Sequence, residues 1–184
     1  MGKASKAGRK KRKSGAPKWC YAIGIGSNQP LSRGLGPRAI VAAALAALDR
    51  RPFRLVARSP VIASRPIGPS QRTYANAVAL IETDEKPMEV LGYLQMLELA
   101  ARRRRARRWG TRTLDLDMLL WSGGIFAGNR LSVPHPAFRT RGFVLGPLRA
   151  VAPRWRDPVS GLRVAHLAAR LAKAKPVDRT PRPR

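Results

Sequence analysis

Cysteine and histidine are scarce in this 184-residue chain, and their scarcity excludes two kinds of site. The one cysteine, Cys20, cannot form an intramolecular disulfide. With only His135 and His166 beside it, it also leaves too few soft ligands for a structural zinc site. The apolar residues form short runs, none near the ~20 residues of a membrane span, and the start lacks a secretory signal. We therefore expect a cytoplasmic protein without a membrane partner.

Two common nucleotide-binding signatures are also missing. No stretch of the chain has the spacing G-x-x-x-x-G-K-[ST] of a P-loop. Residues 24–29 begin with two alternate glycines but do not complete the dinucleotide-binding pattern G-x-G-x-x-G. The sequence thus excludes both a P-loop protein and a Rossmann-type dinucleotide-binding protein.

Acidic residues are so few that the formal net charge is +27, from 37 basic and 10 acidic residues. Such an excess by itself favours a nucleic-acid partner. The basic residues gather before Trp19, between Arg102 and Arg112, and after Ala169. The first and last groups are terminal, and like charge with little apolar content is typical of disorder. We therefore expect a disordered basic tail at 1–17, one globular domain at 18–173 and a second basic tail at 174–184.

The spacing of apolar residues predicts the order βαββαβ. This order is typical of the ferredoxin-like α+β fold, in which two helices pack on one face of a mainly antiparallel sheet. A further short strand near Leu131 and a further helix at 164–171 are expected beyond it. The predicted strands of the core are 19–25, 53–64, 73–82 and 114–121, and its predicted helices are 36–51 and 87–101.

Two aspartates lie one residue apart in the last predicted strand. Asp115 and Asp117 therefore project from the same face of that strand. Mg²⁺ prefers hard oxygen ligands and takes one or two carboxylates together with substrate phosphates. A solvated strand face is the alternative for two aspartates alone. The seven arginines at 102–112 favour the metal site, because arginine forms paired hydrogen bonds to phosphate.

The arginine run is interrupted by Trp109 and Gly110. A tryptophan in a basic loop covers a flat heterocycle while the arginines neutralise phosphate, which is the task of a lid. The alternative is a solvated or nucleic-acid-binding surface, with the tryptophan only anchoring the loop. His135 lies between two prolines, and a structural role is equally open for it. Gln95 and Glu98 lie three residues apart on a predicted helix, where both can reach polar groups of a nucleotide.

Taken together, these segments resemble the 6-hydroxymethyl-7,8-dihydropterin pyrophosphokinases of the folate pathway, from Tyr21 to about Pro153. The most specific piece, residues 108–119, is similar to the family signature R-W-G-P-R-T-x-D-x-D-x-L, with Thr111 at the position of its proline. Further matching pieces occur in the family's order: Gly26-Ser27-Asn28, Pro66-Ile67-Gly68-Pro69, Tyr74-x-Asn76, Gln95-x-x-Glu98, Arg130-Leu131-Ser132-Val133-Pro134-His135 and Arg141-Gly142-Phe143-Val144-Leu145.

The resemblance implies a ferredoxin-like fold and transfer of the β,γ-diphosphate of ATP to the pterin alcohol, with AMP as the second product. It implies two Mg²⁺ ions on Asp115 and Asp117. The implied catalytic residues are Arg103, Arg105, Arg112, Asp115 and Asp117. For the pterin, the implied residues are Ser64, Ile67, Tyr74, Asn76, Trp109 and Phe143. For ATP, they are Gln95, Glu98, Arg103, Arg105, Arg112, Met118, Arg130, Ser132, His135 and Arg141.

Two interpretations of the whole chain follow from these observations. The first is an active monomeric pyrophosphokinase that takes MgATP and 6-hydroxymethyl-7,8-dihydropterin. The second is a pyrophosphokinase-like domain with impaired turnover that binds nucleic acid through its basic tails. Any protein of such charge binds nucleic acid non-specifically to some degree, so catalysis separates the two.

Deleting residues 1–17 is expected to change neither the melting temperature nor the rate of AMP production. That segment has almost no large apolar side chains with which to dock on a core. Thermal unfolding and an AMP-release assay on the truncated and full chains check this. A large loss of activity in the truncated protein would show instead that the basic arm takes part in function.

Overall fold

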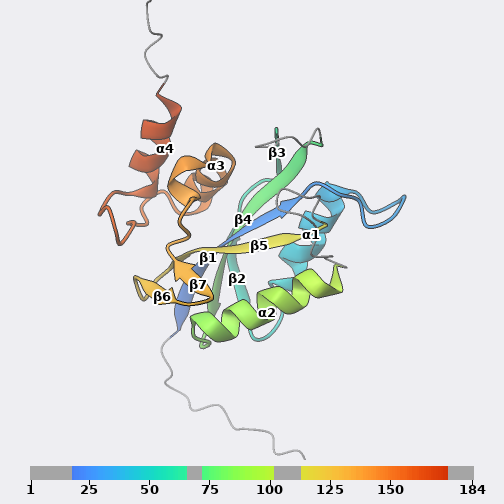
Figure 1. The fold of residues 1–184 in the computed structure, drawn as a ribbon, viewed down its shortest axis with the longest axis horizontal. Helices are drawn as coiled ribbons and strands as arrows, with labels where there is room; N and C mark the ends of the chain where they lie inside the picture. Colours follow the sequence, from blue (N-terminus) through green and yellow to red (C-terminus); the bar gives the residue numbers. More distant parts are fainter. Residues whose placement is uncertain (1–17, 66–71, 102–112, 174–184) are drawn as a thin grey trace, which may run out of the picture.

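An antiparallel sheet forms the centre of the protein, and a computed structural model describes residues 18–65, 72–101 and 113–173 (Figure 1). Four strands follow the order β2-β4-β1-β5, and β3 pairs with β4 beside β2. The predicted ferredoxin-like βαββαβ arrangement is confirmed. The strands are β1 (Trp19–Ser27), β2 (Arg54–Arg58), β3 (Ile62–Ser64), β4 (Tyr74–Thr83) and β5 (Asp115–Trp121).

The predicted strand 53–64 is two strands, β2 and β3, interrupted around Ser59 and Pro60. Proline has no N–H with which to continue a ladder. Ser59 supports the interruption: its N–H donates to the Val78 carbonyl, and its Oγ accepts from the Val78 N–H, each at 2.9 Å. The separate strand β3 then pairs Ser64 with Tyr74 at the start of β4.

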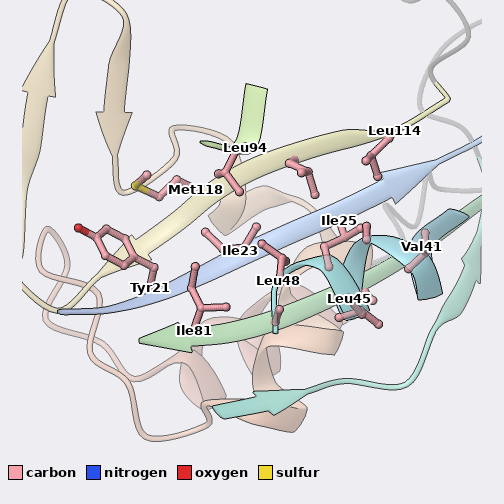
Figure 2. Close-up of a cluster of buried hydrophobic side chains, with 14 of the residues drawn as sticks. Tyr21, Ile23, Ile25, Val41, Leu45, Leu48, Ile81, Leu94, Leu114 and Met118 are labelled. Carbon is pink, nitrogen blue, oxygen red and sulfur yellow. The ribbon is translucent and has the colours of Figure 1, made fainter. Parts of the chain in front are cut away.

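One face of the sheet is covered by α1 (Pro37–Ala47) and α2 (Pro87–Ala100). Each helix begins with proline, whose fixed φ suits the first helical turn. Alternate apolar residues of the strands meet the buried stripes of the helices, and this forms the main core (Figure 2). Members of that core include Ile23, Ile25, Leu45, Leu94 and Met118.

The opposite face is covered in part by α3 (Gly142–Val151) and α4 (Val164–Ala172). A second apolar cluster, with Val78, Leu119 and Leu148 among its members, lies between these helices and the sheet. The predicted helix 164–171 is confirmed as α4. Helix α3 was not predicted from the sequence, because Gly142, Gly146 and Pro147 all disfavour a helix interior.

A hairpin of β6 (Phe126–Gly128) and β7 (Leu131–Val133) follows β5, and a single 3₁₀ turn, η1 (Phe138–Thr140), leads into α3. The predicted short strand near Leu131 is confirmed as β7. Trp121 at the end of β5 contacts the ring of Phe126 edge-on, with ring centroids 6.4 Å apart. In the part of the chain that the structure describes, no helix has the length and apolar character to cross a membrane.

Candidate functional site

Strand β5 presents apolar side chains to one face of the sheet and carboxylates to the other. Leu114, Leu116 and Met118 belong to the main core, with 3%, 6% and 3% of their surface exposed. Asp115 and Asp117 alternate with them and are partly exposed. The side-chain period of two therefore directs both aspartates to the face that α3 covers only in part.

Two glycines of β1 lie directly beside the aspartates. In the antiparallel pairing, Gly26 is opposite Asp115 and Gly24 is opposite Asp117. A Cβ atom on Gly26 would lie 3.3 Å from the Asn76 Oδ1 atom and 4.0 Å from the Asp115 Cβ atom. Glycine at this position keeps the space between Asn76 and Asp115 clear of a side chain, as close approach of a ligand requires.

Asn76 continues the same face onto β4, where it pairs with Gly26 across the ladder. It is 6% exposed, and its Nδ2 donates a 2.8 Å hydrogen bond to the Ser64 Oγ. This bond fixes the side-chain amide, whose carbonyl oxygen is then the atom next to Gly26. Tyr74 lies two residues earlier on β4 and is half-buried. The structure thus brings together Ser64, Tyr74 and Asn76, three of the residues expected to bind the pterin.

His135 approaches the aspartates from the loop after β7. Its Nε2 lies 3.9 Å from the Asp117 Oδ2. Its backbone N–H donates to the Leu119 carbonyl at 3.0 Å, and its Nδ1 accepts from the Ala137 N–H at 3.1 Å. Because Nδ1 acts as an acceptor, the neutral ring carries its proton on Nε2, the atom that faces Asp117.

Arg141 and Phe143 stand at the start of α3, on the side of the sheet that carries the aspartates. The Arg141 guanidinium lies 5.9 Å from the centroid of the Phe143 ring, within range of a cation–π contact. Both side chains are partly exposed, so both remain accessible to a ligand. Arg130 and Ser132 are exposed on the β6–β7 hairpin.

Glu98 and Gln95 come from α2, which covers the other face of the sheet. The Glu98 carboxylate is buried, and its Oε1 accepts a 2.8 Å hydrogen bond from the Leu116 N–H, between the two aspartates. Strand β5 is the outer strand of the sheet, and Glu98 binds its outer edge between the positions of the two aspartates. The Met118 side chain is buried in the core, which leaves only its backbone to meet a nucleotide.

Several expected residues cannot be located. The pterin-loop residue Ile67 and the arginine-loop residues Arg103, Arg105, Trp109 and Arg112 lie outside the described residues, as do the two predicted tails. Gly24, to which no role was assigned from the sequence, accommodates the Leu119 side chain: a Cβ atom there would lie 3.2 Å from the Leu119 Cδ2 atom. Alternate glycines inside a buried strand were the available signal, because glycine there marks a close approach.

The donor atoms at this site fit magnesium better than softer metals. Within 18–65, 72–101 and 113–173, no three His, Cys, Asp or Glu side chains gather into a metal-ligating group. Asp115 and Asp117 instead supply hard carboxylate oxygens on one open face. Such a pair suits Mg²⁺, which keeps several waters and completes its shell with substrate phosphates. Gly26, opposite Asp115, adds no side chain to the space beside this pair.

Comparisons with known proteins agree with this geometry. Residues 22–153 match the family model described as 7,8-dihydro-6-hydroxymethylpterin-pyrophosphokinase. A Pseudomonas aeruginosa protein is 46% identical over 124 residues, covering 66% of this chain and 76% of that protein. A Haemophilus influenzae protein is also 46% identical, covering 53% of this chain and 62% of that protein. Both are named 2-amino-4-hydroxy-6-hydroxymethyldihydropteridine pyrophosphokinase.

Among solved structures, a single-substitution variant of the Plasmodium falciparum HPPK-DHPS protein with pteroate has a TM-score of 0.63 to this chain. It is 10% identical, and the match covers 86% of this chain and 41% of that one. At this identity, the likeness supports the fold alone.

Replacing Glu98 by alanine is expected to lower the free energy of unfolding by about 1–3 kcal/mol, because the buried Leu116 N–H loses its acceptor. Glu98→Gln keeps an oxygen acceptor and is expected to lose less. Denaturant unfolding of both variants checks this. Equal stability of Glu98→Ala and the unmodified protein would mean that Glu98 does not secure β5.

Proposed function

Because the chain belongs to the 7,8-dihydro-6-hydroxymethylpterin-pyrophosphokinase family, we propose that its open sheet face is where the family's reaction takes place. The reaction moves the β,γ-diphosphate of ATP to the hydroxymethyl group of 6-hydroxymethyl-7,8-dihydropterin, a step of folate biosynthesis. The observation that carries the assignment is the pair Asp115 and Asp117 on one face, opposite Gly26 and Gly24.

The transfer is a substitution at the β-phosphorus of ATP. The pterin hydroxymethyl oxygen forms a bond to that phosphorus, and the bond from it to the oxygen bridging to the α-phosphorus breaks. The bonding electrons leave with AMP, and the hydroxymethyl proton is released to solvent. Such a reaction depends on holding the two oxygens in line and on neutralising the phosphate charge.

In our assignment, Asp115 and Asp117 hold Mg²⁺ together with the ATP phosphates. The family uses Mg²⁺, and we propose two ions at this pair. Bound Mg²⁺ neutralises phosphate charge and orients the diphosphate. The Nε2 atom of His135 lies 3.9 Å from the Asp117 carboxylate, so we place its ring beside the metal site and near the phosphates. Arg141 and the predicted loop arginines Arg103, Arg105 and Arg112 supply further positive charge.

For the pterin, the fixed amide of Asn76 is the recognition group. Its Nδ2 is engaged by Ser64, so its Oδ1 is oriented to accept a hydrogen bond from the amino-pyrimidine edge of the pterin. The rings of Tyr74 and Phe143 are partly exposed on the same side and are assigned to stack on the flat heterocycle. Ile67 and Trp109 are also assigned to the pterin.

For the nucleotide, we assign the outer edge of β5 and the hairpin beside it. Glu98 reaches this edge from α2, and Gln95 lies three residues earlier on that helix. Arg130 and Ser132 are exposed on the hairpin. Met118 contributes its backbone. We also propose that the enzyme acts as a monomer in the cytoplasm and that residues 18–173 form its one domain.

A second candidate activity is non-specific nucleic-acid binding, and one feature of α4 favours it. Basic side chains recur every three or four residues along its exposed side, at Arg163, His166, Arg170 and Lys173. Between Met118 and Lys173 the sequence has one acidic residue, Asp157, which is buried. A stripe without nearby counter-charge attracts a polyanion such as RNA.

Removing either aspartate tests the main proposal. Asp115→Ala and Asp117→Ala are expected to abolish AMP production while leaving thermal unfolding nearly unchanged, because these carboxylates hold the metal and phosphates rather than the core. Glu89→Ala, an exposed carboxylate on α2, is the control and keeps activity. Near-normal activity in either aspartate variant would contradict the metal assignment.

Arg112→Ala tests the arginine loop against the nucleic-acid candidate. If the loop stabilises charge as the phosphoryl group moves, kcat falls by on the order of 10² or more, with a smaller effect on ATP affinity. Arg170→Ala, on the α4 stripe, is expected to keep kcat and to weaken RNA binding. The kcat and the RNA affinity of each variant are measured on the same preparation. An unchanged kcat with weakened RNA binding in Arg112→Ala would defeat the catalytic role of the loop.

A further inference from the structure

A fully buried carboxylate beyond the site is held by an unusually large set of donors. Asp157 has 0% of its surface exposed. It accepts from the Arg139 Nε at 2.7 Å and from the Arg139 Nη2 at 2.6 Å. The backbone N–H groups of Val159 and Ser160 donate to it at 3.2 Å each, and the Ser160 hydroxyl donates to it at 2.5 Å. The pairing with arginine is therefore bidentate and enclosed.

This ion pair remains charged at neutral pH. Burial alone would raise the pKa of Asp157, but hydrogen bonds from Arg139, Ser160 and Val159 and the charge of Arg139 lower the pKa to about 2. Since the folded pKa lies below the ordinary value of 3.8, the stabilisation is complete above that pH and is lost as pH falls toward 2. Removing one partner of such a pair leaves an uncompensated charge.

Arg139 lies on the segment that also carries His135 and Arg141, the two residues that we assign to the ATP phosphates. It follows His135 by four residues and precedes Arg141 by two. The segment is tied to β5 at one end, where the His135 N–H donates to the Leu119 carbonyl. Phe138 is buried in the second core, and the Arg139 guanidinium lies 4.6 Å from the centroid of its ring. At the far end of this turn, the two hydrogen bonds from Arg139 to Asp157 anchor the segment to the chain after α3.

We propose that Asp157 is a positioning residue, which acts through Arg139 to hold the loop that presents His135 and Arg141 to the nucleotide. It lies beyond residues 22–153, the part of the chain that matches the family model. The C-terminal segment with α4 is then a support for the binding loop as well as a cover for the sheet. The inference rests on the proposed function, because it assigns these two residues to ATP.

If Asp157 positions this loop, its loss raises the KM for MgATP more than the KM for the pterin. Ser64 lies on β3 and Asn76 on β4. Within the described part of the chain, no hydrogen bond joins these two strands to the turn at 138–140. Among the described residues assigned to the pterin, only Phe143 follows the turn, and it lies within α3, whereas His135 and Arg141, both assigned to MgATP, lie outside that helix. Loosening the turn therefore affects MgATP more than the pterin. A residue needed only for global stability would instead lower the amount of active enzyme and leave both KM values unchanged.

Asp157→Asn is the direct test in the full chain, with kcat and both KM values measured by AMP release. The KM for MgATP is expected to rise about tenfold or more, while the KM for the pterin changes less than about twofold. Hydrogen exchange of the His135 and Ala137 amides is expected to become faster, while exchange in β1 stays the same. Glu82→Gln is the control, because it breaks another ion pair, of 2.6 Å with Arg54, far from this turn.

Arg139→Lys is the second variant and keeps the charge without the guanidinium fork; it is used if Asp157→Asn does not fold. Its expected shift in the KM for MgATP is in the same direction and smaller. Unchanged KM for MgATP and unchanged exchange at 135–141 in a folded variant would overturn the proposal. If the unmodified chain releases no AMP, the proposed function fails separately. Calorimetric MgATP affinity and hydrogen exchange then still decide whether Asp157 positions the loop.

Discussion

The alternation of side chains along β5 is the constraint on which the site depends. Leu114, Leu116 and Met118 enter the main core, and this burial commits Asp115 and Asp117 to the opposite face. A shift of one residue would bury two carboxylates and expose the leucines, so the hydrophobic effect that folds the sheet also fixes the register of the aspartates. Glu98 adds to this by accepting the Leu116 N–H from the core side. The same strand therefore serves stability and binding without a conflict between them.

The face of the sheet opposite the main core has one part packed against helices and another part that carries the aspartates. At one end α3 and α4 cover Val78 and Leu119, and at the other Gly26 adds no side chain beside Asp115. Acidic residues outside the site, such as Glu82 and Glu85, lie at the far end of β4 from Asn76. The two aspartates thus stand in a strongly basic protein with few competing carboxylates nearby. A metal–phosphate group, as we propose for this site, would balance both signs of charge.

Much of this arrangement could be predicted from the sequence, because local patterns determine it. Strict alternation predicted β5 and the shared face of Asp115 and Asp117, and helical spacing predicted both helices of the core. The break of 53–64 into β2 and β3 was missed, although Pro60 is a signal for it. Helix α3 was missed because Gly142, Gly146 and Pro147 argue against a helix, and contacts with the sheet outweigh that local preference. The pair of Arg139 and Asp157 joins residues far apart in sequence, and no local pattern reveals such a contact.

We propose above all that the open face around Asp115 and Asp117 transfers a diphosphate from ATP to a pterin alcohol. Product analysis of the full chain with ATP and Mg²⁺, with and without 6-hydroxymethyl-7,8-dihydropterin, tests this most directly. The account predicts AMP and pterin diphosphate in equal amounts, formed only when the pterin and Mg²⁺ are both present. Release of ADP in place of AMP, or no AMP with all components present, would contradict it.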